Sequence, residues 1–305
     1  MSWGLGGGRR RAGARFVCKT RNECGRSACD PDEDIADTKS NRQFSGRQWR
    51  GGHLNAISSE LMSQSTLGYR PYAPQLRLIP WGEGIWTVNG PEVSYSLGGV
   101  TIPCPTRMTV VQLKDGSLWL HSPVSCEPEL VAAVSALGPV SAIVAPNTLH
   151  YTFLADWVRA FPAASTYAAP SLNTKVPNIA FSVLEERPFE KWRGDIDLHV
   201  VALGSFTEVV FFHRPSRTLI LTDLMQNCEA SRVQSALVRI LLIVGGATGP
   251  NGRPSIEIRL AALLHRAALR RGVAQMLAWE PTGIILSHGE CYHTDGVVEI
   301  KRAFG

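Results

Sequence analysis

Three short apolar runs that each end abruptly in polar side chains constrain this chain's fold most strongly. The runs are residues 144–151 (VAPNTLHY), 219–223 (LILTD) and 284–288 (IILSH). Each is typical of a buried strand that empties into a loop, and in α/β sheets ligands bind beyond the carboxyl ends of the strands. We therefore expect His150, Asp223 and His288 to meet at one edge of a sheet.

The composition excludes some classes of partner. At 305 residues and 44% hydrophobic content, the chain can bury one large core or two small ones. Its net charge of +5 is confined to residues 1–50, which hold 11 Lys and Arg against 6 Asp and Glu, leaving 20 of each sign elsewhere. A neutral body does not suggest a surface that tracks phosphates, so we expect a small-molecule ligand and no nucleic acid.

Cysteine usage and hydropathy bear on the compartment. Seven cysteines form an odd set without a CxxC pair, which favours a reducing, cytoplasmic setting. The longest apolar run, around residues 240–244, is interrupted by Arg239 and is too short for a membrane span, so we expect no membrane partner. The arginines at residues 9–15 suggest organellar targeting as an alternative, which the acidic residues 30–34 oppose.

The chain divides into an extension and one domain. Residues 1–74 are rich in Gly, Arg, Ser and Asn without a helical or strand period, and we interpret them as a disordered, targeting or extraneous segment. Cys18, Cys24 and Cys29 lie there, but no second pair follows to complete a metal site. Residues 75–305 are expected to form the folded domain.

Within that domain, strand and helix patterns alternate. Asp115-Gly116 between two β-rich runs predicts a hairpin, and residues 198–223 predict a meander of three strands. Helical spacing appears at 127–137 and 152–160, and again along most of 233–277, where Gly and Pro at 245–254 interrupt it. A final strand and a short helix near 297–303 follow. This order predicts an α/β architecture.

Two imidazoles and one carboxylate are a common ligand set for a catalytic metal. Three protein ligands leave a coordination position open for water or substrate. The same set is the facial triad of non-haem iron sites. Gly289, directly after His288, would let another backbone segment approach closely.

The runs APNTLH (145–150), EVVFFHRPSRTLILTD (208–223) and SHGE (287–290), in this order of elements, resemble the metallo-β-lactamase superfamily. They are most similar to a branch known as the domain of unknown function 4336 family. The resemblance covers about residue 80 to the end. It implies a four-layer αββα sandwich, two mixed sheets packed face to face with helices outside.

The resemblance also implies a degenerate metal site. Active superfamily members hold two metals with an HxHxDH loop and later His, Asp and His ligands; here that loop falls on residues 146–151 (PNTLHY). The ligands of the first metal are therefore absent except for the bridging Asp223. His150, Asp223 and His288 remain as candidate ligands of one metal.

Four further residues are candidates for the pocket lining. They are Tyr151, Asn147, His121 and Glu208. Tyr151 also suits a packing role, and Asn147 is expected to hold the loop turn or cap the next helix. His121 stands where the family keeps a carboxylate behind the metal ligands, or else at a strand edge in water.

Three functions follow from the resemblance. One is a mononuclear metal-dependent hydrolase, in which zinc or iron polarises the substrate and activates water. The second is a mononuclear non-haem iron enzyme of oxygen chemistry. The third is a metal-free binding or scaffold module, which the missing first half of the loop motif favours.

Overall fold

The computed structural model describes residues 68–97, 100–170, 172–187 and 189–305. Most of the segment expected to be disordered, with Cys18, Cys24 and Cys29, lies outside the described residues. The domain boundary expected at residue 75 stays a prediction. Tyr69 and Tyr72, which precede residue 75, are buried against Val233 and Val238 and contribute to a core.

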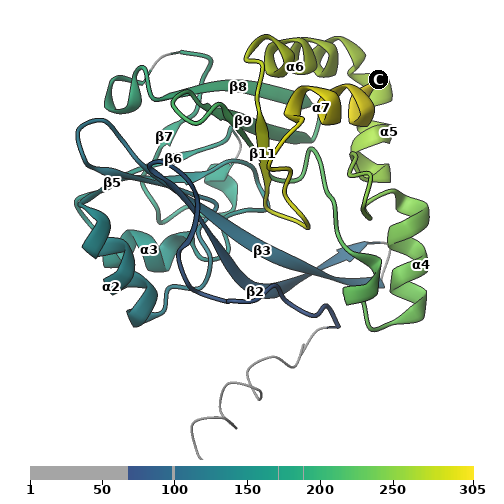
Figure 1. Cartoon of the computed structure of the whole chain (residues 1–305), viewed down its shortest axis with the longest axis horizontal. Coiled ribbons are helices and arrows are strands. Elements are labelled where there is room, and N and C mark those ends of the chain that lie inside the picture. Colours follow the sequence, from purple (N-terminus) through teal and green to yellow (C-terminus); the bar gives the residue numbers. More distant parts are fainter. Residues whose placement is uncertain (1–67, 98–99, 171, 188) are drawn as a thin grey trace, which may run out of the picture. The chain divides into compact units, whose positions relative to one another are not determined.

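The described residues form two mixed sheets (Figure 1). The first has seven strands in sequence order: β1 (Ile79–Gly82), β2 (Ile85–Leu97), β3 (Val100–Gln112), β4 (Leu118–His121), β5 (Val140–Ala145), β6 (Ser165–Ala168) and β7 (Ser182–Val183). Its first four strands are antiparallel, and β4 to β7 run parallel. The hairpin predicted at Asp115-Gly116 joins β3 to β4 and is confirmed.

The second sheet has four strands among the described residues, in the order β11, β10, β9, β8. Their bounds are β8 (Ile196–Leu203), β9 (Phe206–His213), β10 (Thr218–Leu221) and β11 (Gly283–Leu286). The predicted meander is β8 to β10, and β11 adds in parallel to β10. Every residue of β10 and β11 is buried, as expected of strands covered on both faces.

Helices cover the outer faces of the two sheets. They are α2 (Pro128–Leu137), α3 (Leu154–Ala160), α4 (Ala236–Gly245), α5 (Ile256–Leu264), α6 (Arg266–Ala278) and α7 (Gly296–Phe304). Helices α2 and α3 pack on the first sheet, whereas α5, α6 and α7 pack on the second. The core between the sheets contains Trp119 and Val144 from one and Phe211 and Ile285 from the other. The predicted four-layer αββα sandwich is confirmed. No helix among the described residues combines the length and apolar character that crossing a bilayer requires.

The loops after β5 and β10 meet across the two sheets. Asn147 forms an isolated antiparallel bridge with Glu208 of β9, and the Val209 N–H donates to the Pro146 carbonyl at 2.9 Å. Pro146 and the polar residues after it end β5, so the chain turns towards the second sheet instead of extending the first. This crossing brings the predicted site residues together.

Candidate functional site

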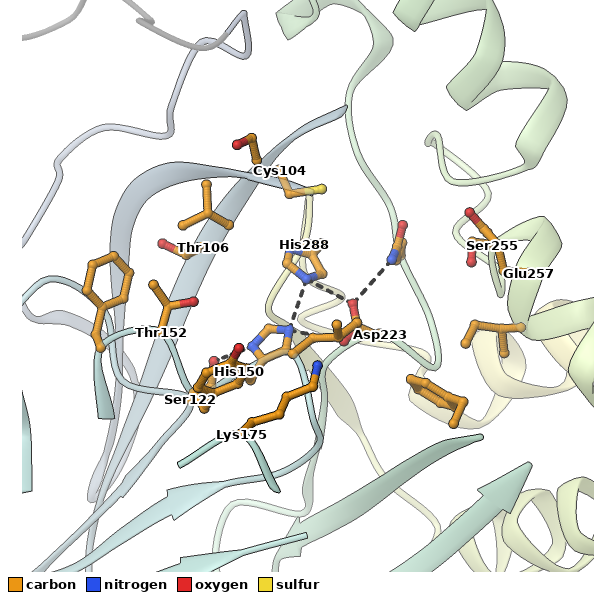
Figure 2. A pocket seen from close by; sticks show the side chains of 18 of the residues that line it. Cys104, Thr106, Ser122, His150, Thr152, Lys175, Asp223, Ser255, Glu257 and His288 are labelled. Atoms are coloured by element: carbon orange, nitrogen blue, oxygen red, sulfur yellow. Dashed lines mark hydrogen bonds and ion pairs between the residues drawn. The ribbon is translucent and has the colours of Figure 1, made fainter. Parts of the chain in front are cut away.

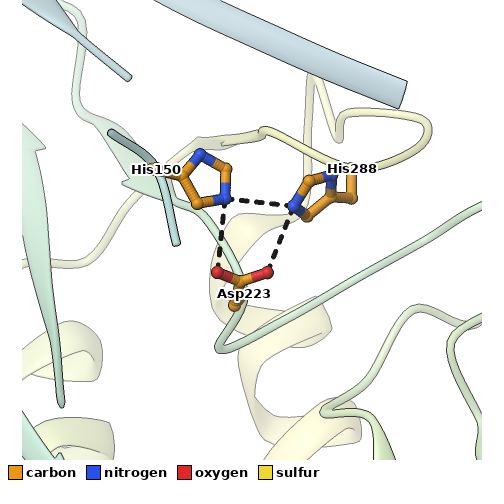
Figure 3. A group of neighbouring side chains, drawn as sticks. All are labelled: His150, Asp223 and His288. Carbon is orange, nitrogen blue, oxygen red and sulfur yellow. Dashed lines mark hydrogen bonds and ion pairs between the residues drawn. The ribbon is translucent and has the colours of Figure 1, made fainter. Parts of the chain in front are cut away.

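His150, Asp223 and His288 converge as their positions at strand ends predict (Figure 3). His150 Nε2 lies 3.2 Å from Asp223 Oδ2, and His288 Nε2 lies 3.1 Å from Asp223 Oδ1. The two Nε2 atoms are 3.1 Å apart. All three side chains are less than a tenth exposed. Each of the three side chains thus has a ligand atom within 4.8 Å of the ligand atoms of the other two.

The far nitrogens of both imidazoles are occupied. His288 Nδ1 donates to the Pro105 carbonyl at 2.6 Å, and His150 Nδ1 lies 2.6 Å from Ser122 Oγ. Because a carbonyl only accepts, His288 Nδ1 carries a proton, and Nε2 of the neutral ring offers a lone pair to the cluster. Metal-binding imidazoles are oriented in this way in proteins.

The electrostatics of the cluster favour one shared positive charge. Burial lowers the pKa of His288, but the Asp223 carboxylate and the Pro105 carbonyl outweigh it and raise that pKa above its ordinary value. Burial lowers the pKa of His150, which Asp223 only partly offsets. Burial opposes ionisation of Asp223, yet the two imidazoles hold its pKa well below the usual range. An anionic carboxylate therefore lies between two nitrogens that a cation, proton or metal, can bridge.

Asp223 is held from both sides by residues of other strands. Asn147 Nδ2 donates to Asp223 Oδ2 at 2.6 Å, while Asn147 Oδ1 accepts the N–H groups of Leu149 and His150 at 2.8 and 2.9 Å. The fully buried Glu208 carboxylate accepts three backbone N–H groups, from Thr222, Asp223 and Leu224, each at 2.8 Å. Asn147 thus positions two of the three candidate ligands, His150 and Asp223, and Glu208 fixes the loop that carries Asp223.

The loop that carries His288 is fixed by Arg107 and Gly289. Arg107 Nη1 donates to the Leu286 carbonyl and, at 2.7 Å, to the Gly289 carbonyl. Gly289 has φ +98°, and a Cβ on it would lie 2.1 Å from the Asn227 carbonyl carbon. The close backbone approach expected at Gly289 is therefore present, because the Asn227 N–H donates to the His288 carbonyl at 3.0 Å.

A cavity of about 420 Å³ opens beside the cluster (Figure 2). His150, Asp223 and His288 line it together with hydroxyl side chains, Lys175 and apolar residues of β2, β3 and α5. Lys175 Nζ donates to the Thr148 carbonyl at 2.8 Å and lies 5.4 Å from the centre of the Tyr151 ring. The volume is that of a pocket for a small molecule.

Four residues were predicted to line the pocket, and the structure describes all four. Tyr151 lines the cavity, and the other three do not. The prediction was wrong for Asn147 and Glu208, which lie behind the cluster and are fully buried. Both side chains hydrogen-bond to the loop that carries Asp223 instead of facing the cavity. The expectation for Asn147 that it holds the loop turn is confirmed. His121 neither lines the cavity nor reaches water: it is fully buried, stacked on Trp119, because β4 ends inside the core between the sheets.

Several residues of the site were not predicted from the sequence. Lys175 lies in an irregular segment that gave no signal. Arg107 is a lone cation within β3, and such a side chain, when buried, needs several acceptors. Pro105 contributes a backbone carbonyl, which no pattern of side chains can reveal. Outside the site, His213 at the end of β9 is also buried, at 2% exposure, and its Nδ1 lies 2.7 Å from Ser216 Oγ.

The donor set fits one divalent metal. Metal–nitrogen bonds of about 2.1 Å at the tetrahedral angle place neighbouring ligand atoms about 3.4 Å apart. Here the two Nε2 atoms are 3.1 Å apart, and each lies 3.1 to 3.2 Å from one of the two Asp223 oxygens, so a small shift of the side chains suffices. Within the described part of the chain, this is the only group of three or more His, Cys, Asp or Glu side chains whose ligand atoms lie within 4.8 Å of one another.

Comparisons with known proteins agree with the fold. A structure of the DIM-1 metallo-β-lactamase exposed to ceftazidime matches with a TM-score of 0.50 at 16% identity, covering 76% of this chain and 95% of that one. A structure of VMB-1 at pH 5.5 matches with a TM-score of 0.51 at 11% identity, covering 76% and 96%. No curated protein sequence matches.

The sequence profile described as "Domain of unknown function (DUF4336)" matches residues 83–238. That range holds β2 to β10, with the loops that carry His150 and Asp223, and more than half of the chain. With a metallo-β-lactamase-like fold around this profile, the chain belongs to the DUF4336 family.

Proposed function

We propose that this protein is a mononuclear metal-dependent hydrolase with His150, Asp223 and His288 as the metal ligands. One observation carries the proposal: two imidazole nitrogens 3.1 Å apart each lie 3.1 to 3.2 Å from one oxygen of the same buried carboxylate, beside a cavity sized for a small molecule. Two imidazoles packed against a buried carboxylate at a cavity wall are rarely needed to stabilise a fold. They are a common ligand set of metal sites.

The chain's own residues perform distinct tasks in this account. Pro105 and Ser122 fix the rings so that both Nε2 atoms face Asp223, and Asn147 holds its carboxylate. Lys175 offers a cation to an anionic group of the substrate at the cavity wall. When bound, the metal supplies polarisation of a carbonyl or phosphoryl oxygen and an acidic water. The apolar walls exclude bulk water from that centre.

A metal-free binding module is the second candidate, and a specific observation favours it. The three groups already bond to one another, so a single proton on His288 satisfies the cluster without any ion. Pro146 and Thr148 stand where active members of the metallo-β-lactamase superfamily carry their HxH pair, and the absence of that pair agrees with a metal-free module. In that case the cavity would bind a small molecule without converting it.

Hydrolysis assays separate these candidates. Chelator-stripped protein is assayed before and after addition of one equivalent of Zn²⁺, Mn²⁺ or Fe²⁺, with ester, lactam, thioester and phosphodiester probes. The proposal expects metal-dependent turnover of at least one probe that Asp223→Ala abolishes. Binding of zinc without turnover of any probe would contradict hydrolysis. Consumption of O₂ by the Fe²⁺ form would point to the oxygen chemistry of a facial triad.

A further inference from the structure

Helices α4 and α5 turn apolar faces to solvent. Nine aliphatic side chains on them, each more than two-fifths exposed, form what we call the α4–α5 apolar face: Leu237, Ile240, Leu241, Ile243, Val244, Ile256, Leu260, Leu263 and Leu264. Val244 is 69% exposed and Leu264 84%. A soluble helix normally exposes polar side chains on the face opposite its buried stripe, so two neighbouring helices that bury Val238 and Ile258 but also expose aliphatic side chains indicate an interaction surface.

The two stripes are regular and adjoining. On α4 the spacing 237, 240, 241 and 244 follows one side of a helix, as does 256, 260, 263 and 264 on α5. The end of α4 is tied to α5 because Arg259 Nη2 donates to the Gly245 carbonyl at 3.1 Å. Figure 1 shows the two helices one above the other along the same side of the molecule. The stripes therefore belong to one surface.

The charge of this region is strongly one-sided. Residues 233–279, from the approach to α4 through α6, contain six arginines and one glutamate, a net charge of +5. Residues 51–305 as a whole hold equal numbers of basic and acidic side chains. Outside residues 233–279, that part of the chain therefore has a net charge of −5. Arg266 and Arg270, which follow the α4–α5 apolar face on α6, are exposed. Arginine beside exposed aliphatic helices is typical of attachment to anionic lipid surfaces.

We propose that the α4–α5 apolar face, with the arginines of α6, docks this protein onto an anionic membrane surface. A second copy of the chain fits less well, because symmetric pairing would set two basic regions against each other. The face also lacks the aromatic side chains that enrich the cores of protein interfaces. Anionic headgroups complement the arginines, and the acyl boundary accepts the leucines.

Docking there places the cavity close to the lipid. Helix α5 contributes Ile258 and Ala261 to the cavity wall, while Leu260 and Leu264 belong to the outward face. The same short helix thus separates the docking surface from the candidate site. The attachment needs no metal, so it stands independently of the hydrolase.

Sedimentation with lipid vesicles tests this proposal on the full chain. The probes are vesicles of phosphatidylcholine mixed with phosphatidylglycerol, and vesicles of phosphatidylcholine alone. The test variant is Val244→Asp with Leu260→Asp, and its matched control is Val183→Asp, an exposed valine on β7. We expect wild type and control to sediment with the mixed vesicles, and the double variant to lose binding about tenfold. Raising the salt concentration weakens the binding.

A second variant guards against misfolding of the first. Arg266→Gln with Arg270→Gln leaves the apolar side chains in place. This variant is expected to bind the mixed vesicles more weakly than wild type, with no change in its binding to vesicles of phosphatidylcholine. The proposal is overturned if no protein sediments with either vesicle, or if all variants sediment equally. It is also overturned if light scattering shows a dimer that the double aspartate variant dissociates while no vesicle is bound.

Discussion

The side-chain amide of Asn147 donates from Nδ2 to Asp223 Oδ2 at 2.6 Å and, through Oδ1, accepts the N–H of His150 at 2.9 Å. A single side chain after β5 therefore sets the distance between a carboxylate of the second sheet and an imidazole of the first. This coupling explains how the loop after β5 presents the His150 imidazole to Asp223 in an ordered position.

Asn147→Ala is accordingly expected to weaken zinc binding about 10- to 100-fold, as removal of a side chain that orients a ligand usually does. The three ligands remain, so the stoichiometry at saturating zinc should not change. Titration against a competing chelator measures the affinity. Asn178→Ala, at an exposed asparagine, is the control. An unchanged zinc affinity in Asn147→Ala would show that the loop is ordered by other contacts.

Glu208→Gln should destabilise the protein by about 1–3 kcal/mol, because an amide cannot accept all three N–H groups that the carboxylate accepts. Its NH₂ group would face at least one backbone donor of residues 222–224. Urea unfolding measures the loss. The exposed, ion-paired Glu185→Gln provides the comparison and should change stability by less than about 0.5 kcal/mol. Equal stability of the two variants would contradict the role given to Glu208.

Gly289→Ala is expected to cost more than about 3 kcal/mol, since it combines positive φ with a clash against backbone. Gly116→Ala separates these two causes: Gly116 also has positive φ, at +80°, but nothing lies within 4 Å of its added Cβ. That control should cost about 1–2 kcal/mol. Thermal unfolding of both variants would decide, and similar losses would mean that the contact with Asn227 yields easily.

The buried His213 predicts a dependence of stability on pH. Burial lowers its pKa to about 4, against an attraction from Asp195 that is too weak to compensate. A histidine with a depressed folded pKa stabilises the fold above its unfolded pKa of about 6.5, and that contribution is lost as pH falls towards 4.

His213→Gln should therefore remove up to about 3 kcal/mol of the stability change between pH 7 and pH 4. His265→Gln, at a half-buried histidine between α5 and α6, is the control. Urea unfolding across this pH range measures the slope. If wild type and His213→Gln share one pH profile, His213 does not bind a proton on unfolding in this window.

Much of the fold could be predicted from the sequence because strands covered on both faces need continuous apolar runs. Residues 219–221 and 284–286 are such runs, and both lie in strands whose residues are all buried. The site followed from the same logic, since polar side chains at the ends of these runs must leave the core.

The rest depends on contacts between distant segments. Helical spacing predicts that residues 236–245 form a helix, but the direction of the apolar stripe depends on what the fold leaves uncovered. In the sequence, His121 and Glu208 are both polar residues near the end of an apolar strand. In the structure, His121 stacks on Trp119, whereas the Glu208 carboxylate accepts backbone N–H groups of the loop that carries Asp223. Tertiary contacts alone separate such cases.

The metal content of the purified protein tests the site most directly. Protein purified without chelator is analysed for metals, wild type beside His288→Ala and Asp223→Ala, with Asn178→Ala as the control. We predict about one equivalent of zinc or iron in wild type and control, and a large loss in both ligand variants. Metal far below one equivalent in all four proteins would contradict the account, as would equal metal in all of them.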